Sequence, residues 1–293
     1  MAEFFEGCIY GIRDLVKSKS IPFVSSEYLS SIRDIKRDVR SKYTLFELGQ
    51  DNKITVFYFF ICWGIYVFFA STSSTFVPSL KKLPSHTYQD WWNHGTAMIH
   101  ASIMFIMASN YWLNVRNDWG VMSASTSAYE RAGIDIMTGY MIYDMIVETV
   151  LVRKINILVL VHHILGLVSH FGTRYLDSGV SAHYTMLIYL AESSTPFLHI
   201  CWLLDKLNKT DTVLFKVLCG IVAFFFFFFR ILMGPYVTYG LSIPVPEWNG
   251  CEHLMWLQVF IMIGFCMLNF YWFYKIIIKS AMNVIMENKK LKQ

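Results

Sequence analysis

The sequence predicts an all-α protein that crosses a membrane about seven times. Hydrophobic residues make up 55% of the 293 positions and charged residues only 16%, whereas a soluble domain carries about 25% charged residues. Each apolar segment is close to the ~20 residues that a helix needs to cross the ~30 Å hydrocarbon core of a bilayer. Helices are expected because a chain in lipid must satisfy its own backbone hydrogen bonds. The segments cover residues 54–70, 95–113, 132–152, 156–171, 180–200, 213–236 and 252–278.

The stretches outside these segments are polar, and the loops between them are short. In residues 1–53, apolar residues at positions 29, 32, 35 and 39 recur at helical spacing opposite a basic face. This pattern predicts a short helix lying on anionic headgroups, with a solvated surface helix as the alternative. Residues 54–90 then hold the first transmembrane helix and a loop, and residues 279–293 form a polar tail. The third and fourth segments meet at the short stretch from Arg153 to Asn156, which predicts an antiparallel hairpin.

Composition and spacing argue against several partners. The net charge of +4 comes without a large basic block, so we expect no nucleic-acid partner. The cysteines form no CxxC pair, and the histidines lack the HxxxH and HxxHH spacing of di-metal hydroxylases and desaturases. We therefore expect no metal. More Lys and Arg lie near span ends on the C-terminal side than on the other side, which predicts a cytoplasmic C-terminus.

Ionisable residues inside the third and fourth segments are the first functional candidates, because burying a charge in a membrane is costly. Tyr140, Asp144 and Glu148 stand at i, i+4 and i+8 on one ridge of the third segment. The adjacent His162 and His163 lie near the middle of the fourth, followed by His170. Across a hairpin, Asp144 can orient a histidine ring and raise its basicity. The alternative is a buried polar network that only locks helix packing.

The later segments add a second group of candidates. Pro196 predicts a kink in the fifth segment, where Glu192, Thr195 and His199 share one face. Arg230 follows six consecutive phenylalanines and either reaches a membrane interface or pairs with a buried anion, of which Glu192 is the first choice. His100 in the second segment faces the same interior or is a satisfied core residue.

These residues together resemble the TLC domain, which ceramide synthases share with translocation-associated membrane proteins and a set of small lipid-related proteins. The matching stretches are MIHA, GYMIYD, the His162–His163 pair, ESSTPFLHICWLL and the phenylalanine run before Arg230, and they fall within residues 91–278. The resemblance implies a six-helix bundle behind one extra helix, with an elongated central cavity for a fatty-acyl chain or another membrane lipid. It also implies the endoplasmic reticulum or another internal membrane.

The resemblance points to the small branch of the family rather than to ceramide synthases. In the synthases, a histidine pair and nearby aspartates carry acyl transfer from acyl-CoA, which would make His162, His163 and Asp144 catalytic here. The synthases continue with a His-Asp…Asp stretch, whereas this chain reads AHYTMLIYLAE, retaining His183 and Glu192. The STPF motif is typical of the small proteins. We therefore expect a lipid-binding protein that influences membrane lipid composition or homeostasis, without a bound cofactor.

Other functions remain as alternatives. The first is a ceramide-synthase-like N-acyltransferase that uses acyl-CoA as co-substrate, so whether the chain is an enzyme stays open. A di-metal lipid enzyme lacks the required histidine spacing. A seven-helix receptor or a transporter is disfavoured by short loops and by the lack of evident broken helices.

Overall fold

The computed structural model describes residues 52–115, 126–152, 156–176, 178–243 and 252–278. All regular structure in these ranges is helical. The expected surface helix within residues 1–53 and the polar tail at 279–293 lie outside the described residues, apart from positions 52 and 53.

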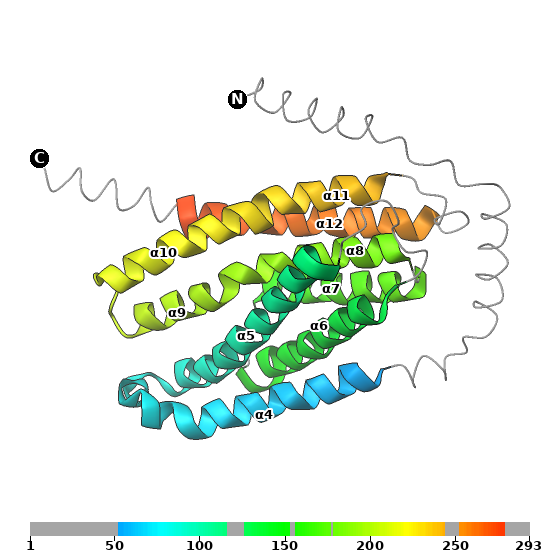
Figure 1. The fold of residues 1–293 in the computed structure, drawn as a ribbon. Coiled ribbons are helices and arrows are strands. Elements are labelled where there is room, and N and C mark those ends of the chain that lie inside the picture. The colour runs from blue at the N-terminus through cyan, green and yellow to red at the C-terminus, as the bar shows by residue number, and fades with distance from the viewer. Residues whose placement is uncertain (1–51, 116–125, 153–155, 177, 244–251, 279–293) are drawn as a thin grey trace, which may run out of the picture.

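Seven helical rods correspond to the seven predicted segments. Successive rods run in opposite directions, so the first begins at one end of the bundle and the last finishes at the other (Figure 1). The rods are α4 (Lys53–Phe76), α5 (Ser85–Asn110), α6 (Ala128–Ile146), α7 (Ile157–Leu176), α8 (Gly179–Ile188) continued by α9 (Thr195–Lys206), α10 (Val213–Phe226) continued by α11 (Met233–Ser242), and α12 (Glu252–Phe273). The prediction of an all-α fold with seven helices is confirmed.

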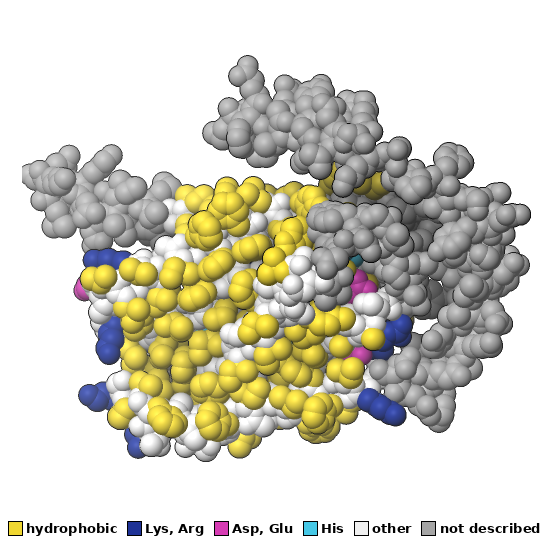
Figure 2. Space-filling model, viewed as in Figure 1, with side chains coloured by type: hydrophobic (Ala, Val, Ile, Leu, Met, Phe, Trp, Pro, Cys, Tyr) yellow, Lys and Arg dark blue, Asp and Glu magenta, His cyan; other side chains and the backbone are white. Residues whose placement is uncertain are grey.

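The outer surface fits a membrane. Hydrophobic side chains cover the middle of the visible face, with Lys and Arg side chains at its two ends (Figure 2). Large apolar side chains such as Phe57, Phe171 and Phe260 are more than half exposed. Five described helices are long and apolar enough to cross a bilayer: Lys53–Phe76, Ile157–Arg174, Gly179–Lys206, Val213–Ser242 and Leu254–Ile278. The protein is therefore a multi-pass membrane protein.

The two helices that miss this criterion, α5 and α6, carry polar residues that face inward. Asn93, Thr96 and His100 of α5 are buried, as are Asp135 and Asp144 of α6. Their polarity lowers the mean hydropathy of each helix without exposing polar groups to lipid.

Two predicted segments that were near the lower length limit prove longer. The first extends from residue 70 to Phe76. In the added stretch, Ser71 and Thr72 donate hydrogen bonds back to the Phe68 carbonyl, at 3.0 and 2.6 Å, so their hydroxyl groups have partners within the helix. The fourth extends from residue 171 to Leu176.

Regular α-helix is interrupted in the fifth and sixth rods. Between α8 and α9 the chain forms a 3-10 segment, η4 (Tyr189–Ser194), and Pro196 is the second residue of α9. Proline has no N–H to donate and is tolerated in the first turn of a helix but not in its interior, which agrees with its place at the start of α9. The kink predicted at Pro196 stays a prediction. Between α10 and α11 lies a π-helical segment, η5 (Phe227–Leu232).

The backbones of α4 and α6 approach each other closely at Gly139. A Cβ atom at this position would lie 2.5 Å from the Thr55 carbonyl oxygen. Around this contact, Tyr58, Cys62 and Tyr66 of α4 pack with Tyr143 and Val147. The first helix is thus joined to the bundle by close helix packing, for which small residues are favoured in membranes.

We expect Gly139→Ala to lower the free energy of unfolding by about 1–3 kcal/mol, because α4 and α6 must separate to admit the methyl group. Gly64→Ala on α4 is the matched control, since no heavy atom lies within 4 Å of its added Cβ. The control should be neutral or slightly stabilising, because alanine favours helix more than glycine does. Thermal unfolding of the purified variants measures both changes, and equal stability of the two variants would contradict this packing.

Candidate functional site

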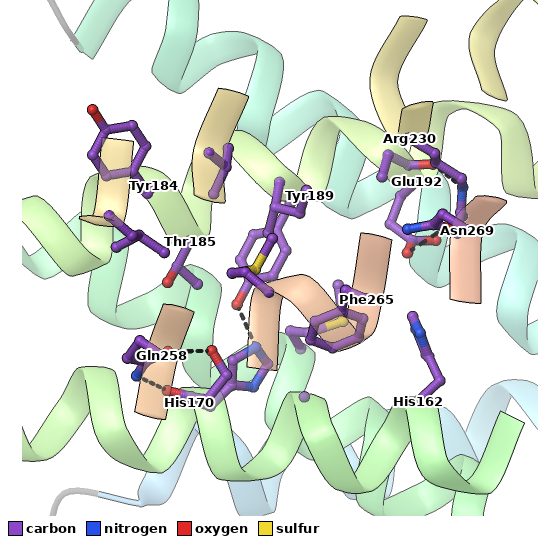
Figure 3. A pocket seen from close by; sticks show the side chains of 18 of the residues that line it. His162, His170, Tyr184, Thr185, Tyr189, Glu192, Arg230, Gln258, Phe265 and Asn269 are labelled. Atoms are coloured by element: carbon purple, nitrogen blue, oxygen red, sulfur yellow. Dashed lines mark hydrogen bonds and ion pairs between the residues drawn. The ribbon is translucent and has the colours of Figure 1, made fainter. Parts of the chain in front are cut away.

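A pocket lies inside the bundle. It is bounded by α6, α7, α8, η4, η5, α11 and α12, and it encloses about 660 Å³ including its opening. Its middle is apolar, with Met137, Met141, Val237, Met262 and Phe265 among the lining residues. Polar groups stand at both ends, which Figure 3 shows. The shape and lining are those of a small-molecule site, which is mostly apolar with a few polar groups.

Arg230 is the cationic group at one end of the cavity. It comes from η5, where the π-helical turn carries one more residue than an α-turn, an irregularity often found at functional sites. Its guanidinium donates from Nε to the Ala191 carbonyl (3.1 Å) and Ser194 Oγ (3.1 Å), and from Nη2 to Thr195 Oγ1 (2.9 Å). The Phe226 ring lies 5.1 Å from the guanidinium carbon. Arg230 therefore does not reach a membrane interface but stays inside the bundle.

The partners of Arg230 come from the interrupted fifth rod. Ala191, Glu192 and Ser194 belong to η4, and Thr195 begins α9. The nearest Glu192 oxygen is 3.9 Å from Arg230 Nη2, an ion-pair distance that is too long for a hydrogen bond. The two irregular helical segments, η4 and η5, thus meet at this end of the cavity.

The adjacent histidines point to different places, because neighbouring residues on a helix are about 100° apart. His162 lines the cavity and packs against Phe265 and Trp272, at ring-centroid distances of 4.9 and 5.4 Å. Its Nδ1 is buried without a hydrogen-bond partner. Figure 3 shows its ring on the opposite wall from Glu192 and Asn269. His163 is buried but is not among the residues that line this cavity.

His163 instead faces the carboxylate of α6. Its Nε2 lies 3.5 Å from Asp144 Oδ2, while Asn93 Nδ2 donates to Asp144 Oδ1 at 2.7 Å. Tyr143 donates to Asn93 Oδ1 at 3.1 Å. This buried network ties α5, α6 and α7 together. The proximity of Asp144 to His163 is thus present, while any catalytic role of the three residues stays a prediction.

The other end of the cavity is fully hydrogen-bonded. His170 contacts Thr138 Oγ1 with Nδ1 (3.0 Å) and the Tyr189 hydroxyl with Nε2 (2.9 Å). Gln258 accepts from Ser169 Oγ at 2.7 Å and donates to the Ser169 carbonyl at 2.8 Å. Figure 3 draws the contact between Tyr189 and His170 and the contacts of Gln258. The ring nitrogens of His170 and the side-chain amide of Gln258 are thus engaged within the protein.

Several predicted site residues do not line this cavity. His100 is stacked on Tyr140 (3.8 Å between centroids) and contacts the Tyr58 hydroxyl of α4 at 3.2 Å. His183 contacts the Tyr111 hydroxyl at 2.8 Å. Glu148 and His163 line a separate hollow of about 200 Å³.

His199 and Pro196 also lie away from the lining residues. His199 stacks with His94 of α5, their ring centroids 4.5 Å apart. Pro196 has no side-chain hydrogen bond to offer, so its contribution is the helix break. Of the predicted residues, His162, His170, Glu192 and Arg230 line the cavity. Thr195 does not line it but accepts a hydrogen bond from Arg230.

Sequence reasoning missed Asn269 and Gln258 of α12. Both are buried and line the cavity. They stand eleven residues apart, or about three helical turns, so they share a face. Their occurrence in an otherwise apolar segment was the signal available in the sequence. Among the described residues, no cluster of three or more His, Cys, Asp or Glu is placed to hold a metal.

Comparison with known proteins identifies the part of the chain that contains this cavity. The TLC domain family matches residues 90–278, which include every lining residue of the cavity. The chain is also similar to a protein of Dictyostelium discoideum named TLC domain-containing protein 4 A. The two are 23% identical over 221 residues, which cover 73% of this chain and 83% of the relative.

The histidines should differ in their effect on stability. We expect His163→Leu to lower the free energy of unfolding by about 3 kcal/mol, because it removes a partner from the buried Asp144. His162→Leu should cost less than about 1 kcal/mol, since it exchanges a side chain with an unpaired nitrogen for an apolar one. Denaturation in mixed micelles measures both.

A second-site change distinguishes lost pairing from lost packing. Adding Asp144→Asn to His163→Leu should recover part of the stability, because an uncharged amide can still bond to Asn93. Equal losses for the two histidine variants, or no recovery in the double variant, would contradict the assignment.

Proposed function

The chain belongs to the TLC domain family, and on that basis we propose that it binds membrane lipid and influences membrane lipid composition or homeostasis. We further propose that all seven rods cross the membrane, with the six from α5 to α12 forming a TLC-type bundle around the central cavity. The helix α4 precedes the matched region and packs against α6 from outside.

The cavity is the observation that carries this proposal. It lies inside the bundle and is lined mainly by apolar side chains with a few polar groups, as ligand pockets usually are. Its apolar middle suits a fatty-acyl chain, and its charged end suits a polar headgroup. An acyl chain that moves from the bilayer into the cavity leaves one apolar environment for another. Selectivity among lipids therefore comes mostly from the polar end of the cavity.

A second candidate function, acyl transfer from acyl-CoA to a lipid amine, has one observation in its favour. His162 lies in the cavity with an unpaired Nδ1, as a base or nucleophile would. The carboxylate that could orient a histidine, Asp144, contacts His163 instead. This division favours lipid binding over catalysis. Acyl-CoA turnover that disappears in His162→Ala but survives in His163→Ala would support the enzymatic alternative.

Filling the cavity should remove bound lipid. Gly166 lines the cavity, whereas Gly220 of α10 has no heavy atom within 4 Å of an added Cβ. We expect Gly166→Leu to reduce lipid retained in washed nanodiscs by about tenfold, while Gly220→Leu retains wild-type amounts. Mass spectrometry of extracted lipid measures retention.

A second cavity variant controls for the possibility that Gly166→Leu fails to fold. Val237→Phe fills the same cavity from α11 and should give the same loss as Gly166→Leu. Size-exclusion profiles and melting curves identify variants that fold. Wild-type retention in both folded cavity variants would refute lipid binding at this place.

We propose that the C-terminal end faces the cytoplasm of the endoplasmic reticulum or another internal membrane. The positive-inside rule supports this orientation. In the described residues, Lys81, Lys82, Lys206, Lys209 and Lys275 lie at or near that end of the rods.

A glycosylation test reports the orientation. The loop after α9 contains the sequon Asn208-Lys209-Thr210. We expect no glycan on this loop, even when it is lengthened to bring the sequon within reach of the lumenal transferase. A sequon inserted between α11 and α12 should be modified. A glycan on the lengthened α9 loop would reverse the proposed orientation.

A further inference from the structure

Within the described structure, polar groups that line the cavity and lack a hydrogen bond lie at one of its ends. His162 Nδ1 is buried and bonded to nothing, and Glu192 accepts no hydrogen bond from any described residue. At the other end, His170 and Gln258 are bonded within the protein. Because buried polar groups are normally satisfied, the unsatisfied end is where a ligand would supply the missing partners.

The same end carries two opposite charges. Glu192 and Arg230 are the acidic and basic side chains among the residues that line the cavity. Their side chains are 20% and 11% exposed, so both are largely shielded from solvent. Together they are electrically neutral. A ligand with a net charge would leave that charge uncompensated in a region of low dielectric, which is unfavourable.

Arg230 is already positioned, whereas Glu192 is not engaged. Neutral oxygens of Ala191, Ser194 and Thr195 hold the guanidinium through Nε and Nη2. Its remaining terminal nitrogen, Nη1, has only a long 3.5 Å contact to Asn269. One donor of Arg230 and both oxygens of Glu192 are thus available to a ligand. Figure 3 places His162 across the cavity from them.

We propose that this end of the cavity selects a single-chain lipid whose headgroup is uncharged and carries both a hydrogen-bond acceptor and a hydrogen-bond donor. A carbonyl or hydroxyl oxygen of the headgroup accepts from Arg230 Nη1. A hydroxyl or amide proton is donated to Glu192. The chain lies along the apolar middle of the cavity. This inference rests on the proposed lipid-binding function and specifies the class of lipid.

Three probes of equal chain length test the inference. They are 1-palmitoylglycerol, palmitate as an anion, and hexadecylamine as a cation, each offered to the full-length protein in phosphatidylcholine nanodiscs at pH 8. Retained probe is measured by mass spectrometry after washing. The wild-type protein should retain palmitoylglycerol at least about tenfold better than either charged probe.

Charge-removing variants should shift the preference in predictable directions. Glu192→Gln leaves Arg230 alone and should favour palmitate. Arg230→Gln leaves Glu192 alone and should favour hexadecylamine. The double variant is neutral again and should return to palmitoylglycerol. Glu192→Gln is the principal test, because Glu192 makes no hydrogen bond within the described structure and its loss should leave folding intact.

The outcomes separate this inference from the proposed function. Retention that Gly166→Leu abolishes, but that shows no dependence on charge in wild type and Glu192→Gln, would overturn the headgroup assignment and leave lipid binding standing. Retention that is equal in wild type and folded Gly166→Leu would overturn lipid binding in the cavity itself. A shift of Glu192→Gln toward palmitate supports both.

Discussion

The structure depends on one constraint, which is that a polar group inside a bilayer must find its partner within the protein. The chain meets this constraint by placing its most polar helices, α5 and α6, with their polar faces inward. Asp144 is the clearest case, because Asn93 and His163 contact its two oxygens from helices on either side. A buried carboxylate with partners on two other helices determines how those helices are rotated. The apolar faces that remain are the ones that meet lipid.

The same constraint explains why irregular helix occurs where it does. A 3-10 or π-helical turn leaves main-chain groups poorly paired, and these are tolerated in a membrane only when other groups satisfy them. Here a side chain of η5 compensates for η4, since Arg230 donates to the Ala191 carbonyl. The two irregular turns therefore lie in contact, and the charged end of the cavity forms where they meet. Broken helices were not evident in the sequence, whereas two of the seven rods carry such a turn between two α-helices, and α5, α6 and α12 each continue into a π-helical turn.

Sequence reasoning identified the segments well because hydropathy depends on residues that are close in the chain. The seven helices, the interruption of α-helix just before Pro196 and the proximity of Arg230 to Glu192 follow from local patterns and from charge. The sequence did not predict that His162 lines the cavity while His163 faces Asp144. This difference depends on the rotation of α7, which is set by Asp144 on one side and by Phe265 and Trp272 on the other. Asn269 was missed for a similar reason, since its amide matters only because η5 lies beside α12.

The charged end of the cavity is not arranged for greatest stability. A tight Arg230–Glu192 pair with two short hydrogen bonds would satisfy both groups. Instead, the donors of Arg230 are directed to Ala191, Ser194 and Thr195, which keeps the guanidinium in place and leaves the carboxylate 3.9 Å away. Natural proteins often sacrifice stability at sites that must bind something. The guanidinium of Arg230 is fixed by neutral oxygens, and the carboxylate of Glu192 beside it accepts no hydrogen bond within the described structure. One group offers a donor and the other an acceptor, so this arrangement favours a ligand that can bond to both.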